Sequence, residues 1–346
     1  MKKRKIGIAL SGGVDSTACA LLLRKHHEVH GFFMRLTGPD PTLLAAQEQR
    51  ARTVAAKLGM ELEVIDLSLA FNRTILHSFT ATYAQGRTPN PCMLCNQTIK
   101  FGLFQKAILE RGMDAMATGH YARIERNGEL AQLCRGKDTA KDQSYFLARL
   151  HQQQLRHCLF PLGEMTKEAS YQVVEEQGLT GFRGQESQDI CFLGSITVGQ
   201  FLQERLAQAE KPGSIVTRDG QILGSHKGLF HYTIGQRRGL GLADITPWYV
   251  VALDPQSNHV IIGKEEDLYH DRLRIHTPHW LQDCPNPEQS YQVKIRYRHQ
   301  GADARVQQIE DTCWEIRFDT PQRAITPGQF AVIYAQDRVI GCGEIQ

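Results

Sequence analysis

The N-terminal segment constrains the fold of this chain more than any other feature. An apolar run from Ile6 to Leu10 is followed directly by a serine and two glycines, and helix-forming residues come next. A continuous apolar run of this length is typical of a strand that is buried on both faces. The segment therefore predicts a buried strand, a tight turn and a helix, which together begin a parallel α/β sheet.

The first half of the chain repeats this alternation. A later helix is expected between an N-cap at Thr166 and a stop at Gly178. Strands and helices in alternation predict a parallel, doubly wound sheet. The further strands are expected at 29–34, 62–67 and 115–118, and the helices between them at 17–25, 51–58 and 101–109.

The second half is rich in turns and in β-type alternation. Asp219-Gly220 lies between two short apolar runs and predicts a hairpin. Apolar residues alternate with charged ones at 293–298 and 314–318, as expected for half-buried strands. We therefore expect an α/β domain over residues 1–200, a small β-rich linker domain over 201–268 and a β-barrel or sandwich over 269–346.

Composition favours a soluble protein of a reducing compartment. The 346-residue chain has no apolar run long enough to cross a membrane, and its N-terminal run is too short for a secretion signal. A cytoplasmic location without a membrane partner is therefore expected. The nine cysteines should then be thiols, and six lie in contexts typical of core residues: Cys19, Cys134, Cys158, Cys284, Cys313 and Cys342.

A phosphate site is predicted where the first strand enters the first helix. Gly12 and Gly13 allow the main chain to approach an oxyanion closely, and the free N–H groups of the helix start converge there. Ser11 and Ser16 can add hydroxyl donors, and Asp15 can hold Mg²⁺ against the phosphates. No lysine follows the glycines, so the loop differs from that of kinases and GTPases. The alternative is a tight turn without a ligand.

Three cysteines lie in polar or turn-rich segments. Cys92 and Cys95 form a C-x-x-C between prolines and Asn96, and the prolines favour an extended, non-helical backbone before the helix. A zinc ribbon would need a second such pair at the right spacing, and the chain has none. Cys191 lies between two apolar residues, where periodicity alone favours a buried core strand.

A set of motifs occurs in order along the chain: Ser11–Ser16, Gly86–Phe101, Ala117–Tyr121, Lys141–Phe146, Glu186–Phe192, His231–Gly239 and Thr326–Gln329. Over nearly the whole chain they resemble those of the tRNA-specific 2-thiouridylases, bacterial enzymes that thiolate the wobble uridine. The first motif also resembles the loop of the ATP pyrophosphatase superfamily. The resemblance implies an N-terminal ATP pyrophosphatase domain, a central β-rich domain and a C-terminal tRNA-binding β-barrel.

The chemistry that this resemblance implies is ATP-dependent sulfur transfer to tRNA. ATP would adenylate the C2 oxygen of uridine, with pyrophosphate released. Sulfur carried by Cys191 as a persulfide would displace AMP, and Cys95 would release the sulfur through a transient Cys95–Cys191 disulfide. A persulfide donor or relay protein would reload Cys191.

The resemblance also implies contacts for both substrates. The nucleotide would contact Ala9, Leu10, Ser11, Gly12, Gly13, Val14, Asp15, Ser16, Met34 and Gly119. The tRNA would contact Asn90, Pro91, Cys92, His120, Lys141, Asp142, Gln143, Arg296, Tyr297 and Gln329. The target uridine would be flipped into a pocket lined by the first three of these. Core packing remains the alternative for Met34, and a structural histidine for His120.

Cys92 is a departure, because many members of the family carry Asp at this position. The group that would transfer protons is therefore open. Cys92, Cys95 and Cys191 also make a set of three thiols, so a 4Fe–4S cluster with one open iron is an alternative to the persulfide route.

A basic strand is the other candidate RNA contact. Four cationic residues and only Asp303 as an anion lie within 291–305, and a solvated strand face is the alternative explanation. Two rival functions remain: another enzyme with a pyrophosphatase-type loop, such as an amide-forming ligase, and a non-catalytic tRNA- or iron–sulfur-binding protein.

Overall fold

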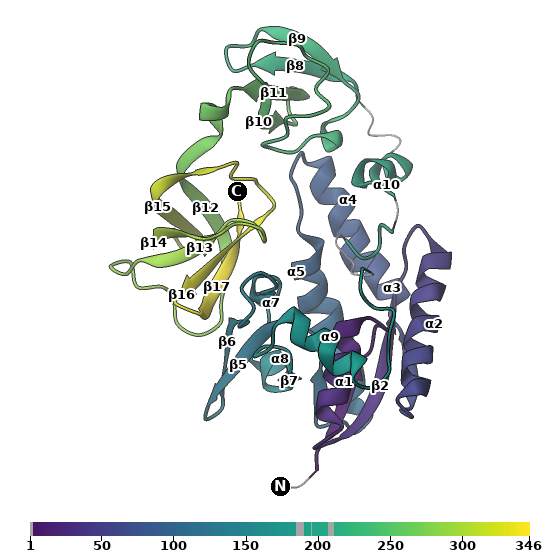
Figure 1. The fold of residues 1–346 in the computed structure, drawn as a ribbon. Helices are drawn as coiled ribbons and strands as arrows, with labels where there is room; N and C mark the ends of the chain where they lie inside the picture. Colours follow the sequence, from purple (N-terminus) through teal and green to yellow (C-terminus); the bar gives the residue numbers. More distant parts are fainter. Residues whose placement is uncertain (1–2, 185–189, 195, 207–210) are drawn as a thin grey trace. The chain divides into compact units, whose positions relative to one another are not determined.

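The structure, a computed structural model, describes residues 3–184, 190–194, 196–206 and 211–346 (Figure 1). The chain divides into two compact units. The first comprises residues 1–75, 92–195 and 337–339, and the second comprises residues 76–91, 196–336 and 340–346. No helix among the described residues is both long enough and apolar enough to cross a membrane.

The first unit is built on a five-stranded sheet with the order β3-β2-β1-β4-β7. Every neighbouring pair is parallel, which confirms the doubly wound sheet. The order runs outwards from β1 in both directions, so β1 and β4 flank the point where the winding reverses. Ligands of such sheets bind at the carboxyl ends of the strands at this point. The strands are β1 (Lys5–Ala9), β2 (Glu28–Arg35), β3 (Leu62–Asp66), β4 (Ala115–Ala117) and β7 (Cys158–Leu159).

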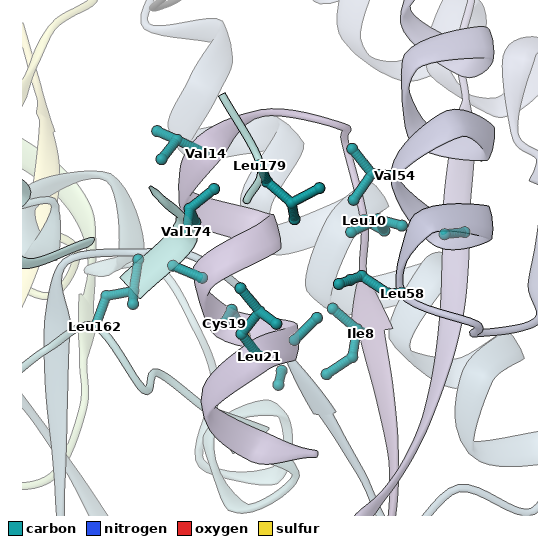
Figure 2. Packing of buried hydrophobic residues seen from close by; sticks show 14 of the residues in the cluster. Ile8, Leu10, Val14, Cys19, Leu21, Val54, Leu58, Leu162, Val174 and Leu179 are labelled. Atoms are coloured by element: carbon teal, nitrogen blue, oxygen red, sulfur yellow. The ribbon is translucent and has the colours of Figure 1, made fainter. Parts of the chain in front are cut away.

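Helices cover both faces of this sheet. Alternate residues of β1 point to opposite faces and therefore pack against different helices. Ile6 and Ile8 are fully buried in a core cluster with the helices α1 (Val14–Leu23), α2 (Pro41–Lys57) and α9 (Lys167–Glu175). Figure 2 shows Leu10, which follows β1, beside Val54 and Leu58 of the α2 segment. On the other face, a Cβ atom on Gly7 would touch Ile108 of α6 (Gln105–Glu110).

Capping side chains set the starts of two of these helices. Thr166 accepts a hydrogen bond from the backbone N–H of Ala169, which confirms it as the N-cap of α9. The helix α2 begins ten residues earlier than predicted, because Asp40 accepts hydrogen bonds from the N–H groups of Thr42 and Leu43 and Pro41 occupies its first turn.

The remaining elements of the first unit are short. Its helices include α3 (Ser68–Phe71), α5 (Pro91–Cys95), α7 (Ser144–Leu147), α8 (Gln152–Arg156) and the π-helical segments η1 (Asn72–Leu76) and η2 (Asn96–Phe104). The hairpin of β5 (Ala122–Asn127) and β6 (Leu130–Arg135) is antiparallel, and Cys134 of β6 pairs with Arg338.

The second unit contains a four-stranded sheet with the order β10-β11-β8-β9. Its strands are β8 (Gly213–Thr217), β9 (Ile222–His226), β10 (Tyr249–Asp254) and β11 (His259–Gly263). β8 and β9 pair antiparallel, which confirms the hairpin predicted at Asp219-Gly220. The helices of this unit are α4 (His77–Ala84), α10 (Val198–Arg205) and the short turns η4 (Leu229–His231) and η5 (Glu265–Leu268).

The same unit holds a C-terminal antiparallel barrel. Its strands are β12 (Tyr269–Trp280), β13 (Tyr291–Lys294), β14 (Ala302–Glu310), β15 (Cys313–Arg323), β16 (Phe330–Ala335) and β17 (Arg338–Ile345). The barrel closes because β12 pairs with both β15 and β17. The prediction of a strand over 293–298 is wrong beyond Lys294, where β13 ends. Ile295 stays buried, Arg296 lies in a bend and Tyr297 in the turn that follows.

Candidate active site

The glycine loop lies at the carboxyl end of β1, where a doubly wound sheet binds its ligand. Gly12 has a φ of +79°, and a Cβ atom there would lie 2.7 Å from the backbone nitrogen of Ala51. Only glycine fits this position. Gly13 is the exposed N-cap of α1, and none of the side chains that the structure describes caps this helix. Ser16 donates a hydrogen bond to the Gly13 carbonyl over 3.0 Å. The N–H groups at this helix start suit an anion.

Asp15 lies in the first turn of α1 and is held by Tyr121, the last residue of the Ala117–Tyr121 motif, and by Lys167, which was not predicted as a site residue. Lys167 Nζ lies 2.8 and 2.9 Å from its two carboxylate oxygens, and the hydroxyl of Tyr121 donates to it over 2.8 Å. The Tyr121 hydroxyl is also hydrogen-bonded to Ser170 on α9, the helix that packs against α1. The pair Asp15–Lys167 spans 152 residues, and no local pattern marks it.

The end of β4 approaches the same loop. A Cβ atom on Gly119 would lie 2.7–2.9 Å from the backbone and Cβ of Asp15, so a glycine is required for this approach. The next residue, His120, lies against the rings of Phe101 and Phe160, and its Nδ1 is 2.6 Å from the hydroxyl oxygen of Thr118. Burial, and secondarily Lys100, lowers the pKa of His120 well below its usual value. A neutral imidazole therefore adjoins the loop.

The C-x-x-C segment departs from its predicted conformation. Residues 87–90 have no regular secondary structure, and the helix α5 begins at Pro91 rather than after Asn96. Proline suits the first position of a helix because its φ is already helical. It lacks an N–H group, but an N–H at this position would have no acceptor within the helix. Cys92 and Cys95 therefore lie one helical turn apart.

Cys191 lies in a turn and is exposed, so the buried core strand that periodicity alone favoured is wrong. Burial, and then the charge of Cys191, raises the pKa of Cys92 to about 12, and the same two causes raise the pKa of Cys95. Surrounding protein atoms also raise the pKa of the Cys191 thiol, although part of the residue is exposed. The three thiols, here called the thiol group, are mainly protonated at neutral pH because burial raises the pKa of each.

Lys100 is the shared cation of this group, although the sequence analysis noted it only as part of a helix. It lowers the pKa of each of the three thiols, against the larger effect of burial, and acts on His120 as well. It lies in the π-helical segment η2, a type of distortion frequent at functional sites. Lys100 is therefore distinguished by the conformation of its backbone and not by a residue pattern in the sequence.

The three thiols do not form a metal site as they stand. Among the described residues, no group of three or more His, Cys, Asp or Glu side chains is arranged to hold a metal ion. No step of the proposed reaction runs through a cluster. Of the six other cysteines, five are buried as predicted, whereas the prediction for Cys284 is wrong because it is exposed.

The Lys141–Gln143 loop is organised by its own side chains. The Asp142 carboxylate is buried and accepts from the N–H groups of Gly136 and Ser144 and from the Ser144 hydroxyl. Gln143 accepts from the N–H of Tyr121 over 3.0 Å. Asp142 and Gln143 therefore shape the loop, and half-buried Lys141 is the member with a cationic side chain.

Within the second unit, Gln329 fixes the chain before Asn90. Its side-chain amide donates to the carbonyls of Thr88 and Pro89, over 2.9 and 3.2 Å. A Cβ atom on Gly328 would lie 2.8–3.0 Å from the backbone of Thr88. Arg296 donates a hydrogen bond to the Arg323 carbonyl. The ammonium of Lys294 lies 5.7 Å from the centre of the Tyr297 ring.

Met34 and residues 186–189 are the remaining predicted site positions. Met34 is half-buried at the penultimate position of β2, beside Ile65 of β3, so it is not a fully buried core residue. The acidic and polar part of the Glu186–Phe192 motif, residues 186–189, lies outside the described residues.

Three family models match successive parts of the chain. They are described as a tRNA methyl transferase HUP domain over residues 4–195, a tRNA methyl transferase PRC-barrel domain over 199–264 and an aminomethyltransferase beta-barrel domain over 270–345. A solved structure of U34-tRNA thiolase NcsA from Methanococcus maripaludis, with its 4Fe–4S cluster, matches 60% of this chain and 65% of its own at 15% identity and a TM-score of 0.36. That likeness is too weak to carry an argument.

Curated relatives match over essentially their full length. Proteins named tRNA-specific 2-thiouridylase MnmA are 49% identical in Desulfotalea psychrophila, over 100% of both chains, and 43% identical in Syntrophotalea carbinolica, over 99% of both. A third, from Acidithiobacillus ferrooxidans, is 40% identical over 100% of this chain and 99% of its own. The glycine loop, the three thiols and these relatives lead to one conclusion: the chain belongs to the tRNA-specific 2-thiouridylase family.

Proposed function

We propose that this protein is a tRNA-uridine 2-sulfurtransferase that consumes ATP at the glycine loop and transfers sulfur through Cys191 and Cys95. The observation that carries the proposal is that the unit containing the loop at the carboxyl end of β1 also contains both thiols, although they are 96 positions apart in the sequence. Family membership supports tRNA as the substrate and uridine thiolation as the reaction.

ATP is expected at the carboxyl ends of β1 and β4. Its phosphates would lie against the N–H groups of residues 11–16, with Ala9, Leu10, Met34 and Gly119 around the nucleoside. The Asp15–Lys167 pair would open, since the triphosphate attracts Lys167 and frees the Asp15 carboxylate for Mg²⁺. Lys167 would then contribute a charge-assisted hydrogen bond to a phosphate oxygen.

The sulfur step is a substitution followed by thiol–disulfide exchange. The terminal sulfur of a Cys191 persulfide attacks C2 of the adenylated uridine, and AMP leaves with the former C2 oxygen. The Cys95 thiolate then attacks Sγ of Cys191. The bond between that Sγ and the transferred sulfur breaks, leaving 2-thiouridine and a Cys95–Cys191 disulfide that an external reductant must reduce.

The tRNA is expected to contact both units. Asn90, Pro91, Cys92 and His120 would receive the flipped uridine, and Lys141 would meet its strand. Arg296, Tyr297 and Gln329 would contact the tRNA from the barrel. We assign residues 1–200 to catalysis, 201–268 to a linker domain and 269–346 to tRNA binding.

The test is a reconstituted reaction with ATP, Mg²⁺, a persulfide source and unmodified tRNA, read as 2-thiouridine after nucleoside digestion. Cys191→Ser should abolish the product, whereas Cys284→Ser, at an exposed cysteine outside the group, should not. Full activity of Cys191→Ser would support a ligase-type reaction instead. An iron and acid-labile sulfide assay on anaerobically purified enzyme tests the cluster alternative, which fully active, iron-free protein would exclude.

Methyl transfer to tRNA is the second candidate, because the description of the N-terminal family model names it. It needs neither ATP cleavage nor a second thiol. Incorporation of label from methyl-labelled S-adenosylmethionine, in place of 2-thiouridine formation, would favour it.

A further inference from the structure

Thr118 has no role in the proposed sulfur transfer, yet its side chain is hydrogen-bonded to His120, a residue of the proposed uridine pocket. The Thr118 hydroxyl oxygen lies 2.6 Å from Nδ1 of His120, and Thr118 is only 3% exposed. Two phenyl rings hold the imidazole in this orientation, since the ring centres of Phe101 and Phe160 lie 5.6 and 5.8 Å from its own. His120 itself is half-buried and follows the carboxyl end of β4.

The Thr118 hydroxyl determines which ring nitrogen of His120 carries the proton. Among the described residues, this hydroxyl has one hydrogen-bond partner, Nδ1 of His120. If Nδ1 carried a proton, the hydroxyl oxygen would accept it, and the hydroxyl's own hydrogen would have no acceptor. A buried donor without an acceptor is unfavourable. The hydroxyl therefore donates to Nδ1, and the proton of the neutral ring is on Nε2.

The same contact opposes a positive charge on the imidazole. An imidazolium carries hydrogen on both nitrogens and would leave the Thr118 hydroxyl without its acceptor. Burial, and secondarily the charge of Lys100, lowers the pKa of His120 and so acts in the same direction. Within the part of the chain that the structure describes, Nε2 makes no hydrogen bond. His120 is thus a neutral donor whose Nε2–H can bond a ligand at the carboxyl end of β4.

Uracil and cytosine both carry the C2 oxygen, so an enzyme that activates this atom must distinguish the two bases elsewhere. At C4, uracil has an oxygen that accepts hydrogen bonds, whereas cytosine has an amino group that donates them. We infer that His120 donates its Nε2–H to the O4 oxygen of the target uracil, and that Thr118 is the positioning residue that keeps this nitrogen a donor. The inference rests on the proposed sulfur transfer and deepens it, because the pair selects uridine over cytidine.

Cytosine would place its amino group against the same N–H. Two donors would then face each other, and neither would have an acceptor. This mismatch should lower kcat/KM for cytidine about 5- to 150-fold relative to uridine. A bond from Nε2 to the O2 oxygen would instead serve both bases alike, so the ratio of the two kcat/KM values tests the assignment to O4.

The first experiment compares two tRNAs that differ only in a uridine or a cytidine at the target position. Formation of 2-thiouridine and of 2-thiocytidine is measured with ATP, Mg²⁺ and a persulfide source. Thr118→Val replaces the hydroxyl by a methyl group, lets Nε2 become an acceptor for the cytosine amino group, and should lower the uridine-to-cytidine ratio by a factor of about 5 or more. Thr118→Ser should restore the ratio. The control Thr53→Val, which removes an exposed hydroxyl of α2, should leave it unchanged.

The second experiment needs neither tRNA nor an active variant. In protein labelled with ¹⁵N-histidine, two-bond ¹H–¹⁵N correlation spectra report which ring nitrogen carries the proton, and His120→Asn identifies the signals of His120 by their loss. Wild-type protein at pH 7 should show the proton on Nε2 and none on Nδ1.

Three results would overturn the inference: a protonated Nδ1 in wild-type protein, equal kcat/KM of wild-type protein for the two tRNAs, or a wild-type ratio in folded Thr118→Val. The first two do not require any variant to fold. Absence of 2-thiouridine from wild-type protein with the uridine tRNA would overturn the proposed function, and the role of His120 with it, whatever the spectra show.

Discussion

Gly119→Ala should weaken ATP binding more than it weakens the fold. The added Cβ would lie 2.7 Å from the carbonyl carbon of Asp15, about 0.7 Å inside the 3.4 Å at which ordinary contact begins. Its neighbour is backbone, which cannot rotate away. Overpacking of this kind costs about 1–3 kcal/mol. For a unit of this size that cost lowers Tm by roughly 2–12 °C.

The effect on ATP is expected to be larger because the displaced residue belongs to the phosphate loop. Loss of one charge-assisted hydrogen bond costs about 1.5–3 kcal/mol, so Kd for ATP should rise roughly 10- to 150-fold. Calorimetric titration with ATP and thermal melting give the two quantities separately.

A matched control separates strain from binding. Gly163→Ala would also drive a Cβ into backbone, that of Ala122, in the same unit but outside the phosphate loop. It should lower Tm and leave the ATP affinity of folded protein within about twofold. An unchanged Tm and an unchanged Kd in Gly119→Ala would refute the argument that this glycine is required by its approach to Asp15.

Three further predictions concern charge, thiol reactivity and packing. Lys167→Met should raise Kd for ATP by roughly 10- to 150-fold, while Lys167→Arg should recover part of the loss, as measured by calorimetry; equal affinity in all three proteins would exclude the lysine from phosphate binding. The rate of iodoacetamide labelling of Cys92, followed by peptide mass spectrometry, should rise about tenfold per pH unit from pH 7 to 10 without a plateau, because burial raises the pKa of Cys92 to about 12. A labelling rate that levels off at the same pH as that of free glutathione would contradict this. Leu10→Ala should lower the free energy of unfolding of the first unit by about 2–5 kcal/mol, since Leu10 is 1% exposed in its core; a loss below 1 kcal/mol in denaturant titration would contradict the packing in Figure 2.

The parallel sheet was predictable because strands buried on both faces have a composition of their own. Ile6 and Ile8 contact the core while Gly7 lies under a helix on the other face, and only a continuous apolar run suits both surroundings. The glycine loop was predictable for a similar reason, since the positive φ of Gly12 restricts its position to one residue type.

Ambiguous local signals account for the errors. Pro91 was taken to exclude a helix, but proline is equally suited to the first helical position. Alternation continued through Tyr297 although the strand ends at Lys294, because Ile295 remains buried without pairing in the sheet. Lys167 was missed because its partner Asp15 is distant in sequence, and the contact depends on packing between α1 and α9.

The electrostatic role of Lys100 also could not be predicted from the sequence. In a regular α-helix, a residue five positions after Cys95 would lie about 140° around the axis from it. The π-helical segment changes that angle, and no residue pattern identified it.

The central claim is that ATP activates the C2 oxygen of the target uridine and that thiol-borne sulfur replaces this oxygen. The most direct test is a single turnover on tRNA whose target uridine carries ¹⁸O at C2, with mass spectrometry of the AMP. The account predicts one labelled AMP for each 2-thiouridine formed. Unlabelled AMP alongside 2-thiouridine would contradict it.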